Sequence, residues 1–152
     1  MTRAVLVVDM LRAFLEEGYP LYCGASARRI IPNVQGLLER ELSEGAKIFF
    51  IGDRHIPDDP EFKIFPPHSV AGTIEAEIIP ELAGYPGEII PKRHYSGFFG
   101  TALEKKLKKL NPEKIVVCGV ATNICVLYTV ADARNRDYAV EVPVDCVASM
   151  NE

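Results

Sequence analysis

Residues 114–125 read Lys114-Ile115-Val116-Val117-Cys118-Gly119-Val120-Ala121-Thr122-Asn123-Ile124-Cys125, an apolar run that passes through a glycine into a helical pattern. A continuously apolar run is typical of a strand buried on both faces, because a half-exposed strand alternates apolar with polar residues. Similar runs predict further strands at 4–8, 47–51, 88–91 and 138–142. Helical patterns lie between them, at 30–44, 101–110 and 123–134.

Continuous apolar strands separated by helices predict an α/β fold of three layers, in which a mostly parallel, Rossmann-like sheet is covered by helices on both faces. The 152 residues contain no repeat or linker, so we expect residues 1–152 to form a single domain. The stretch 54–86 is proline-rich and irregular, with one short helix expected near 74–79. Irregular segments of this length in compact domains are usually functional or mobile.

Composition excludes several classes of protein. Apolar residues make up 48% of the chain and charged residues 25%, which rules out a collagen-like, disordered or disulfide-scaffold protein. Apolar runs fall far short of a membrane span, and the net charge of −4 comes without a basic stripe. We therefore expect neither a membrane nor a nucleic-acid partner. The densest basic cluster is predicted to be a solvated helix face and comprises Lys105, Lys106, Lys108 and Lys109.

The four cysteines show no Cys-x-x-Cys spacing, so a reducing, cytoplasmic setting is expected. Cys118 lies in an apolar run and Cys146 beside one, which indicates buried core thiols. Cys23 lies in a loop without a visible partner. Cys125 differs from these three by its position directly after a predicted strand.

Chemically reactive residues follow several of the predicted strands. They are Asp9, Asp53, Lys92 and the segment 119–125. In an open parallel sheet these positions meet at the carboxyl edge, where ligands bind. A lone acid after a strand is usually a turn residue or a helix cap, but four such positions on one edge favour a site.

Cys125 is placed within the first turn of a predicted helix, for which Thr122 or Asn123 is the expected N-cap. Unpaired amides and the helix dipole favour a thiolate there, and a nearby lysine would lower the thiol pKa further. An acid could accept and return the proton. Asp9, Lys92 and Cys125 are thus a candidate catalytic set. The alternative, a buried cysteine that packs under the helix, stays open on this reasoning.

Three segments together resemble the signature segments of the isochorismatase-like cysteine hydrolases, a superfamily that includes nicotinamidases, isochorismatases and N-carbamoylsarcosine amidases. They are Val7-Val8-Asp9-Met10, Pro91-Lys92-Arg93-His94-Tyr95-Ser96 and Gly119-Val120-Ala121-Thr122-Asn123-Ile124-Cys125-Val126. The resemblance is closest to nicotinamidase/pyrazinamidase and implies the isochorismatase-like hydrolase fold. It implies that Cys125 attacks a carboxamide carbon, that Asp9 transfers the proton to the leaving ammonia, and that Lys92 holds both by charge.

The resemblance also implies a cis peptide between Val120 and Ala121, and an oxyanion hole formed by the amides of Ala121 and Cys125. Four side chains are expected to line a pocket for a flat ring, although each aromatic among them could instead be ordinary core: Phe14, Phe65, Tyr95 and Val120. The pair Phe98-Phe99 could help to close that pocket. Arg12 is interpreted as a contact either for an anionic substrate or for a surface partner.

A metal site is implied by the segments Asp53-Arg54-His55 and Phe65-Pro66-Pro67-His68, which resemble that of nicotinamidases. Asp53, His55 and His68 would be the ligands, since oxygen and imidazole donors suit a divalent metal ion: zinc in the first place, with iron or manganese as alternatives. Glu61 matches a third histidine of one subgroup and is either a ligand or a loop charge. His94 is left outside the metal site.

The expected function is that of a metal-dependent amidohydrolase which converts a small aromatic carboxamide, nicotinamide, to the acid and ammonia through a cysteine thioester. The alternatives are an isochorismatase-type or other amide hydrolase of the superfamily, and a non-catalytic binding member. Family habit implies a homo-oligomer, a dimer or a tetramer. Ser149-x-x-Glu152 is a capping-box pattern that begins a helix, and the resemblance implies a further helix and a sixth strand. We therefore expect either a C-terminal truncation that removes the last helix and strand of the fold, or a missing sheet element that a partner supplies.

Overall fold

A parallel sheet forms the centre of the computed structural model, which describes residues 2–150. Within this range its six strands are β1 (Arg3–Val8), β2 (Lys47–Asp53), β3 (Glu88–Lys92), β4 (Lys114–Val120), β5 (Val140–Glu141) and β6 (Val147–Ala148). The hydrogen-bonded order is β3-β2-β1-β4-β5, and β6 pairs with the end of β4. Every pair is parallel, as predicted.

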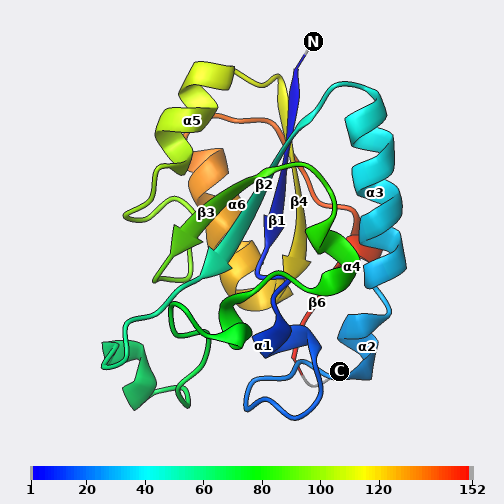
Figure 1. Ribbon diagram of the computed structural model, residues 1–152. Helices are drawn as coiled ribbons and strands as arrows, with labels where there is room; N and C mark the ends of the chain where they lie inside the picture. Colours follow the sequence, from blue (N-terminus) through cyan, green and yellow to red (C-terminus); the bar gives the residue numbers. More distant parts are fainter. Residues whose placement is uncertain (1, 151–152) are drawn as a thin grey trace.

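Helices cover both faces of this sheet and complete the three layers expected from the sequence (Figure 1). The helices are α1 (Arg12–Leu15), α2 (Ala25–Arg28), α3 (Ile31–Ser43), α4 (Pro80–Ala83), α5 (Leu103–Leu110) and α6 (Leu127–Asn135). Short 3-10 turns occur at Pro60–Lys63, Ile74–Ala76 and Val144–Cys146, and a π-helical turn at Thr122–Val126. In Figure 1, α3 and α4 lie on one side of the sheet, and α5 and α6 lie on the other.

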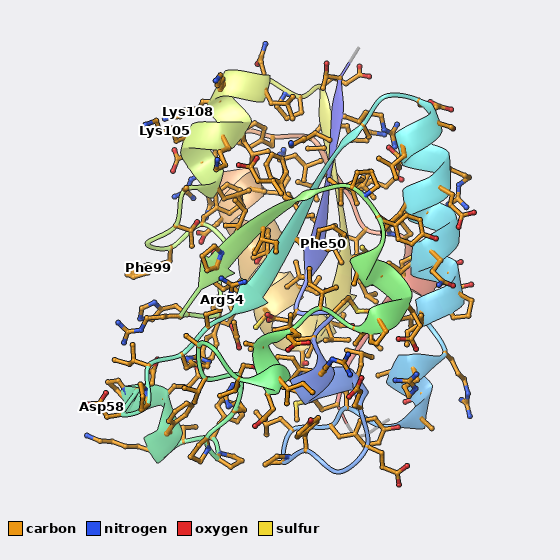
Figure 2. All side chains as sticks on the ribbon, in the orientation of Figure 1. Phe50, Arg54, Asp58, Phe99, Lys105 and Lys108 are labelled. Atoms are coloured by element: carbon orange, nitrogen blue, oxygen red, sulfur yellow. The ribbon has the colours of Figure 1, made fainter. Side chains whose placement is uncertain are left out.

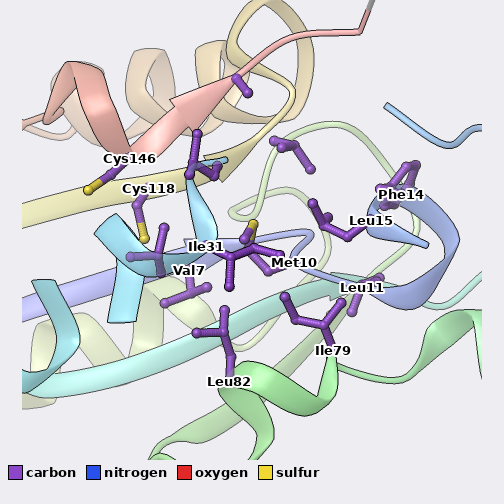
Figure 3. Close-up of a cluster of buried hydrophobic side chains, with 14 of the residues drawn as sticks. Val7, Met10, Leu11, Phe14, Leu15, Ile31, Ile79, Leu82, Cys118 and Cys146 are labelled. Carbon is purple, nitrogen blue, oxygen red and sulfur yellow. The ribbon is translucent and has the colours of Figure 1, made fainter. Parts of the chain in front are cut away.

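Both faces of the central strand β1 are buried, which explains why its sequence is apolar throughout. Val5 and Val7 pack in the core on the side of α3, and Leu6 and Val8 in the core on the side of α5 and α6. Each fully buried side chain of this size contributes about 1.5–3 kcal/mol. Figure 3 shows the first core, where Cys118 and Cys146 lie among aliphatic side chains, so the prediction of two buried core thiols is confirmed.

The structure differs from the sequence prediction mainly in its shortest elements. The four-residue helices α1 and α2 and the two-residue strand β6 were not predicted, because so short a segment shows no period in its hydrophobic pattern. The strand predicted at 138–142 is reduced to Val140–Glu141. The expected helix that would begin at Ser149 depends on residues 151–152, which lie outside the described part of the chain, so it stays a prediction.

The lysine cluster lies on α5, and Figure 2 shows Lys105 and Lys108 directed away from the sheet. Lys108 pairs with Glu104 one helical turn away at 3.2 Å, and Lys106 pairs with Glu88 of β3. These contacts agree with the predicted solvated helix face. Between residues 2 and 150, no helix is both long and apolar enough to span a membrane.

Candidate active site and metal centre

The carboxyl edge of the sheet collects the reactive side chains. Asp9 directly follows β1, Asp53 is the last residue of β2, and Lys92 is the last residue of β3. Asp53 and Lys92 are opposite each other in the pairing of β2 with β3. Cys125 lies in the π-helical turn that follows β4. Because the strands are parallel and their carboxyl ends are aligned, residues far apart in the sequence meet at one edge, as the sequence analysis expected.

Lys92 lies at the centre of this group and is almost fully buried. Its Nζ is 3.0 Å from Asp9 Oδ2 and 3.4 Å from Cys125 Sγ. The same ammonium donates to Asp53 Oδ1 and, at 2.9 Å, to the carbonyl of His94. The other oxygen of Asp9 accepts the Asp53 backbone N–H at 2.9 Å. The lysine therefore pairs with two buried carboxylates and contacts the thiol at the same time.

Burial controls the protonation of the site. It raises the pKa of Asp9 to about 6, together with the negative charge of Asp53. Burial also raises the pKa of the Cys125 thiol well above its usual value, and the charge of Asp9 adds to this, although Lys92 acts in the opposite direction. Lys92 thus lowers the thiol pKa, as expected, but burial and Asp9 outweigh it, so the expected net shift toward a thiolate is wrong. Cys125 rests as a thiol beside a carboxylate that can accept its proton.

The turn that carries Cys125 is also capped differently from the prediction. Its N-cap is Ala121, and no side chain donates or accepts a capping hydrogen bond there, so the expectation of Thr122 or Asn123 as the cap is wrong. The peptide bond between Val120 and Ala121 is cis, as the resemblance implied. The carbonyl of Ala121 accepts the N–H groups of Ile124 and Val126, both at 3.1 Å, which ties the turn to the strand end.

A second cluster shares Asp53 with the first. Oδ1 of Asp53 contacts Lys92, and Oδ2 faces the second cluster. The cluster consists of Asp53, His55, Glu61 and His68, each offering one ligand atom within 4.8 Å of the others. His55 Nε2 is 3.3 Å from Asp53 Oδ2 and 3.4 Å from Glu61 Oε2. His68 Nε2 is 3.6 Å and 3.3 Å from the same two oxygens. The structure thus places Glu61 with the three predicted ligands.

These spacings suit a metal ion. Four ligands at about 2.1 Å from a tetrahedral ion lie about 3.4 Å from one another. The other ring nitrogens are already engaged, since His55 Nδ1 bonds Asp59 Oδ2 at 2.9 Å and His68 Nδ1 donates to the Pro66 carbonyl at 2.8 Å. Both Nε2 atoms consequently face the two carboxylates. Two imidazoles with two carboxylates form a donor set that fits zinc, iron or manganese.

A pocket adjoins both clusters. It is lined by the four side chains predicted for the substrate, namely Phe14, Phe65, Tyr95 and Val120. The reactive and metal-site residues that line it are Asp9, Asp53, Glu61, His68, Ala121 and Cys125. The Phe14 and His68 rings pack edge to face with their centroids 5.6 Å apart, so the aromatic side of the pocket borders the candidate metal cluster.

Four further residues line this pocket, and the sequence did not single them out for it: Leu21, Cys23, Ile124 and Met150. Leu21 and Cys23 lie in the loop between α1 and α2, where no spacing signals a site. Asp59, the hydrogen-bond partner of His55, was also missed, although its separation of four residues from a candidate ligand histidine was a usable signal.

Some aromatic and charged residues considered from the sequence lie outside the pocket. Phe98 is buried in the core beneath α5, and Phe99 is exposed beside His94. Arg12 pairs with Glu16 at 3.0 Å and with Glu77 at 3.5 Å, so it is held at the surface and does not line the pocket. His94 lies outside the metal cluster, as expected.

Comparison with known proteins shows the same combination of sequence and fold. A sequence family described as the isochorismatase domain matches residues 3–152. Nicotinamidase PncA from Bacillus subtilis is 32% identical, with 99% of this chain and 88% of that one covered and a TM-score of 0.90. N-carbamoylsarcosine amidase from Thermoplasma acidophilum is also 32% identical, with coverages of 100% and 87% and a TM-score of 0.91. The pyrazinamidase of Pyrococcus horikoshii in complex with zinc is 32% identical, with coverages of 98% and 87% and a TM-score of 0.90. The chain belongs to the isochorismatase family of hydrolases.

Proposed function

We propose that this protein is a metal-dependent amidohydrolase that cleaves a small, neutral aromatic carboxamide, with nicotinamide as the reference substrate. Asp9, Lys92 and Cys125 would carry out the reaction, and Asp53, His55, Glu61 and His68 would hold the metal ion. The proposal is supported by the contact of Lys92 with both Asp9 and Cys125, and by a pocket that joins this group to aromatic walls.

In the first half of the reaction, the Cys125 thiol gives its proton to Asp9 as Sγ attacks the amide carbon. The carbonyl oxygen gains negative charge, which the backbone N–H groups of Ala121 and Cys125 would stabilise. Asp9 then returns the proton to the nitrogen, the C–N bond breaks, and ammonia leaves. An acyl thioester remains on Cys125.

In the second half, water attacks the thioester carbon and gives a proton to Asp9. The C–S bond breaks, the carboxylic acid is released, and Cys125 recovers its thiol proton. Lys92 keeps its positive charge through both halves because two carboxylates surround it and raise its pKa, although burial acts in the opposite direction. It thereby balances the negative charge that moves between Asp9 and the sulfur.

The metal site would orient the substrate. When bound by Asp53, His55, Glu61 and His68, a zinc, iron or manganese ion supplies a coordination position for a ring nitrogen of the substrate. The edge contact between Phe14 and His68 places an aromatic surface next to that position. A flat ring between such walls would present its carboxamide to Cys125.

The observation that carries the choice of substrate is the charge of the pocket. Among the described residues that line it, three are acidic and none is lysine or arginine. Asp53 and Glu61 would balance the charge of a divalent ion, and Lys92 is engaged by Asp9 and Asp53. An anionic substrate, such as one with a carboxylate, would therefore find no free cation, whereas a neutral aromatic amide needs none.

Ammonia release from a panel of amides tests this choice. We expect kcat/KM for nicotinamide and pyrazinamide to exceed that for N-carbamoylsarcosine and ureidoacrylate by about 100-fold or more, since an unpaired buried charge costs several kcal/mol. Benzamide, which has the same shape but no ring nitrogen, separates the contribution of the ring from that of the ring nitrogen. Faster turnover of the two anionic amides would contradict the proposed substrate class.

Removal of the metal ion tests the orienting site. Dialysis against a chelator is expected to reduce nicotinamide turnover by about 10-fold to 1000-fold, because the ring would lose its anchor while Cys125 stays in place. Addition of zinc, manganese or iron(II) should restore activity, and metal analysis should then find one ion per chain. Unchanged turnover in a protein shown to be free of metal would remove the ion from the proposal.

A further inference from the structure

Asp59 is a buried carboxylate that contacts two residues of the metal cluster and lies outside the substrate pocket. It precedes the 3-10 turn Pro60–Lys63 and is 6% exposed. Its Oδ2 bonds Nδ1 of His55 at 2.9 Å, and its Oδ1 accepts the backbone N–H of Glu61 at 3.1 Å. One side chain therefore touches two of the four metal-site residues. Asp59 does not line the substrate pocket, so it can act only through its neighbours.

The two histidines of the cluster are oriented by different groups. His68 donates its Nδ1–H to the uncharged carbonyl of Pro66, whereas His55 meets the carboxylate of Asp59. A neutral imidazole carries its proton on either nitrogen, and a carboxylate at Nδ1 selects the form whose Nε2 lone pair is free to bind a metal ion. The negative charge also makes that nitrogen a stronger donor. Only His55 receives this electrostatic support.

Arg93 connects this arrangement to the catalytic group. Its Nε is 3.3 Å from Asp59 Oδ2, and it directly follows Lys92 at the end of β3. The side chain of Arg93 is 42% exposed, which leaves its pair with Asp59 partly open to water. The main chain is tied at the same place, because the N–H of Arg54 donates to the Lys92 carbonyl at 2.8 Å.

We propose that Asp59 is a positioning residue for the metal centre. It accepts the Nδ1 proton of His55, which turns Nε2 toward the cluster, and it anchors the main chain at Glu61, so that both ligands are in place before the ion binds. This inference rests on the proposed function, in which His55 and Glu61 are metal ligands. It gives Asp59 a role that is separate from binding the ion or the substrate.

The test compares Asp59→Ala with Asp59→Asn and with Asp58→Ala. Asp58 is the neighbouring aspartate, which is exposed and points outward from the same loop (Figure 2), so its replacement controls for loss of charge in this loop. Nitrogen-15 NMR of the histidine side chains in the zinc-loaded proteins reports which ring nitrogen of each histidine carries the proton and how fast that proton exchanges with water. Competition with a zinc-binding dye reports zinc affinity without any need for turnover.

We expect His55 of the zinc-loaded native protein to bind the ion through Nε2 and to keep on Nδ1 a proton that exchanges slowly with water. In Asp59→Ala, the Nδ1 proton of His55 should exchange faster with water while His68 stays unchanged, and the Kd for zinc should rise about 10-fold to 100-fold. Asp59→Asn keeps an acceptor without the charge and should weaken zinc binding less, whereas Asp58→Ala should match the native protein. The Asn variant also keeps the test open if the Ala variant fails to fold.

Two results would count against these ideas, and they are distinguishable. Native-like His55 and native zinc affinity in Asp59→Ala would overturn the positioning role while leaving the metal site intact. Failure of the native protein to bind zinc, manganese or iron(II) would overturn the metal site and, with it, this inference. Equal changes at His55 and His68 in Asp59→Ala would indicate a general loosening of the loop and would also overturn the positioning role.

Discussion

Replacement of Cys125 with alanine is expected to reduce ammonia release from nicotinamide by about 10⁴-fold or more, because Cys125 is the thiol that contacts Lys92, whereas Cys23, the other thiol of the pocket, donates to the carbonyl of Leu21. The variant should remain folded, since alanine fits the space of a buried cysteine with little loss of packing. A coupled ammonia assay measures the first effect, and a thermal melt followed by circular dichroism measures the second.

Cys118→Ala is the matched control for this variant. Cys118 is a buried thiol in β4, close to Cys125 in the sequence, but it packs in the core and does not line the pocket. Its replacement should preserve turnover within about threefold after correction for folded protein, because it touches none of the reacting groups. Comparable turnover in Cys125→Ala and Cys118→Ala would refute the thioester mechanism.

Replacement of Gly119 with alanine is expected to destabilise the fold by about 4 kcal/mol or more. Gly119 has a φ of 118°, and an added Cβ would lie 2.0 Å from the backbone carbonyl oxygen of Val8. Val8 belongs to the central strand β1 and directly precedes Asp9, so relief of this clash would displace the paired strands at the site itself. Urea unfolding followed by circular dichroism measures the loss.

Gly18→Ala separates the clash from the backbone effect. Gly18 has a φ of 103°, but an added Cβ there would meet no atom within 4 Å. This substitution should cost only about 1–2 kcal/mol, the ordinary penalty for a side chain in such a conformation. Equal losses in the two variants would show that β1 and β4 can separate without cost and would contradict the close-approach explanation.

The strands could be predicted from the sequence because a strand buried on both faces needs apolar side chains at consecutive positions. Ala4–Val8 and Ile115–Gly119 are apolar throughout, and the structure places both runs in the middle of the sheet. The position of Asp9, Asp53 and Lys92 at one edge followed from the same pattern, since each stands where an apolar run ends. Short elements such as β6 left no such mark, because two residues cannot show a period.

The roles of individual side chains depended on contacts between residues that are far apart in the sequence. Cys125 stands in the turn that the sequence predicted, yet its pKa is raised because burial and the Asp9 carboxylate outweigh Lys92. Desolvation is set by everything that surrounds a group, so neighbours in the sequence cannot report it. Asp59 differs in that its separation of four residues from His55 was visible in the sequence, but only the fold shows the bond that places it beside the candidate metal cluster.

By itself, the sequence determined the parallel α/β sheet, its carboxyl edge and the residue types available there, because hydrophobic periodicity and strand ends are local properties. Only the tertiary structure decided that Glu61 joins Asp53, His55 and His68, that Cys23 and Met150 help to line the pocket, and that no described lysine or arginine lines it. These features arise where distant loops pack together over the sheet edge. The charge and enclosure that would select a neutral amide are therefore properties of the folded chain.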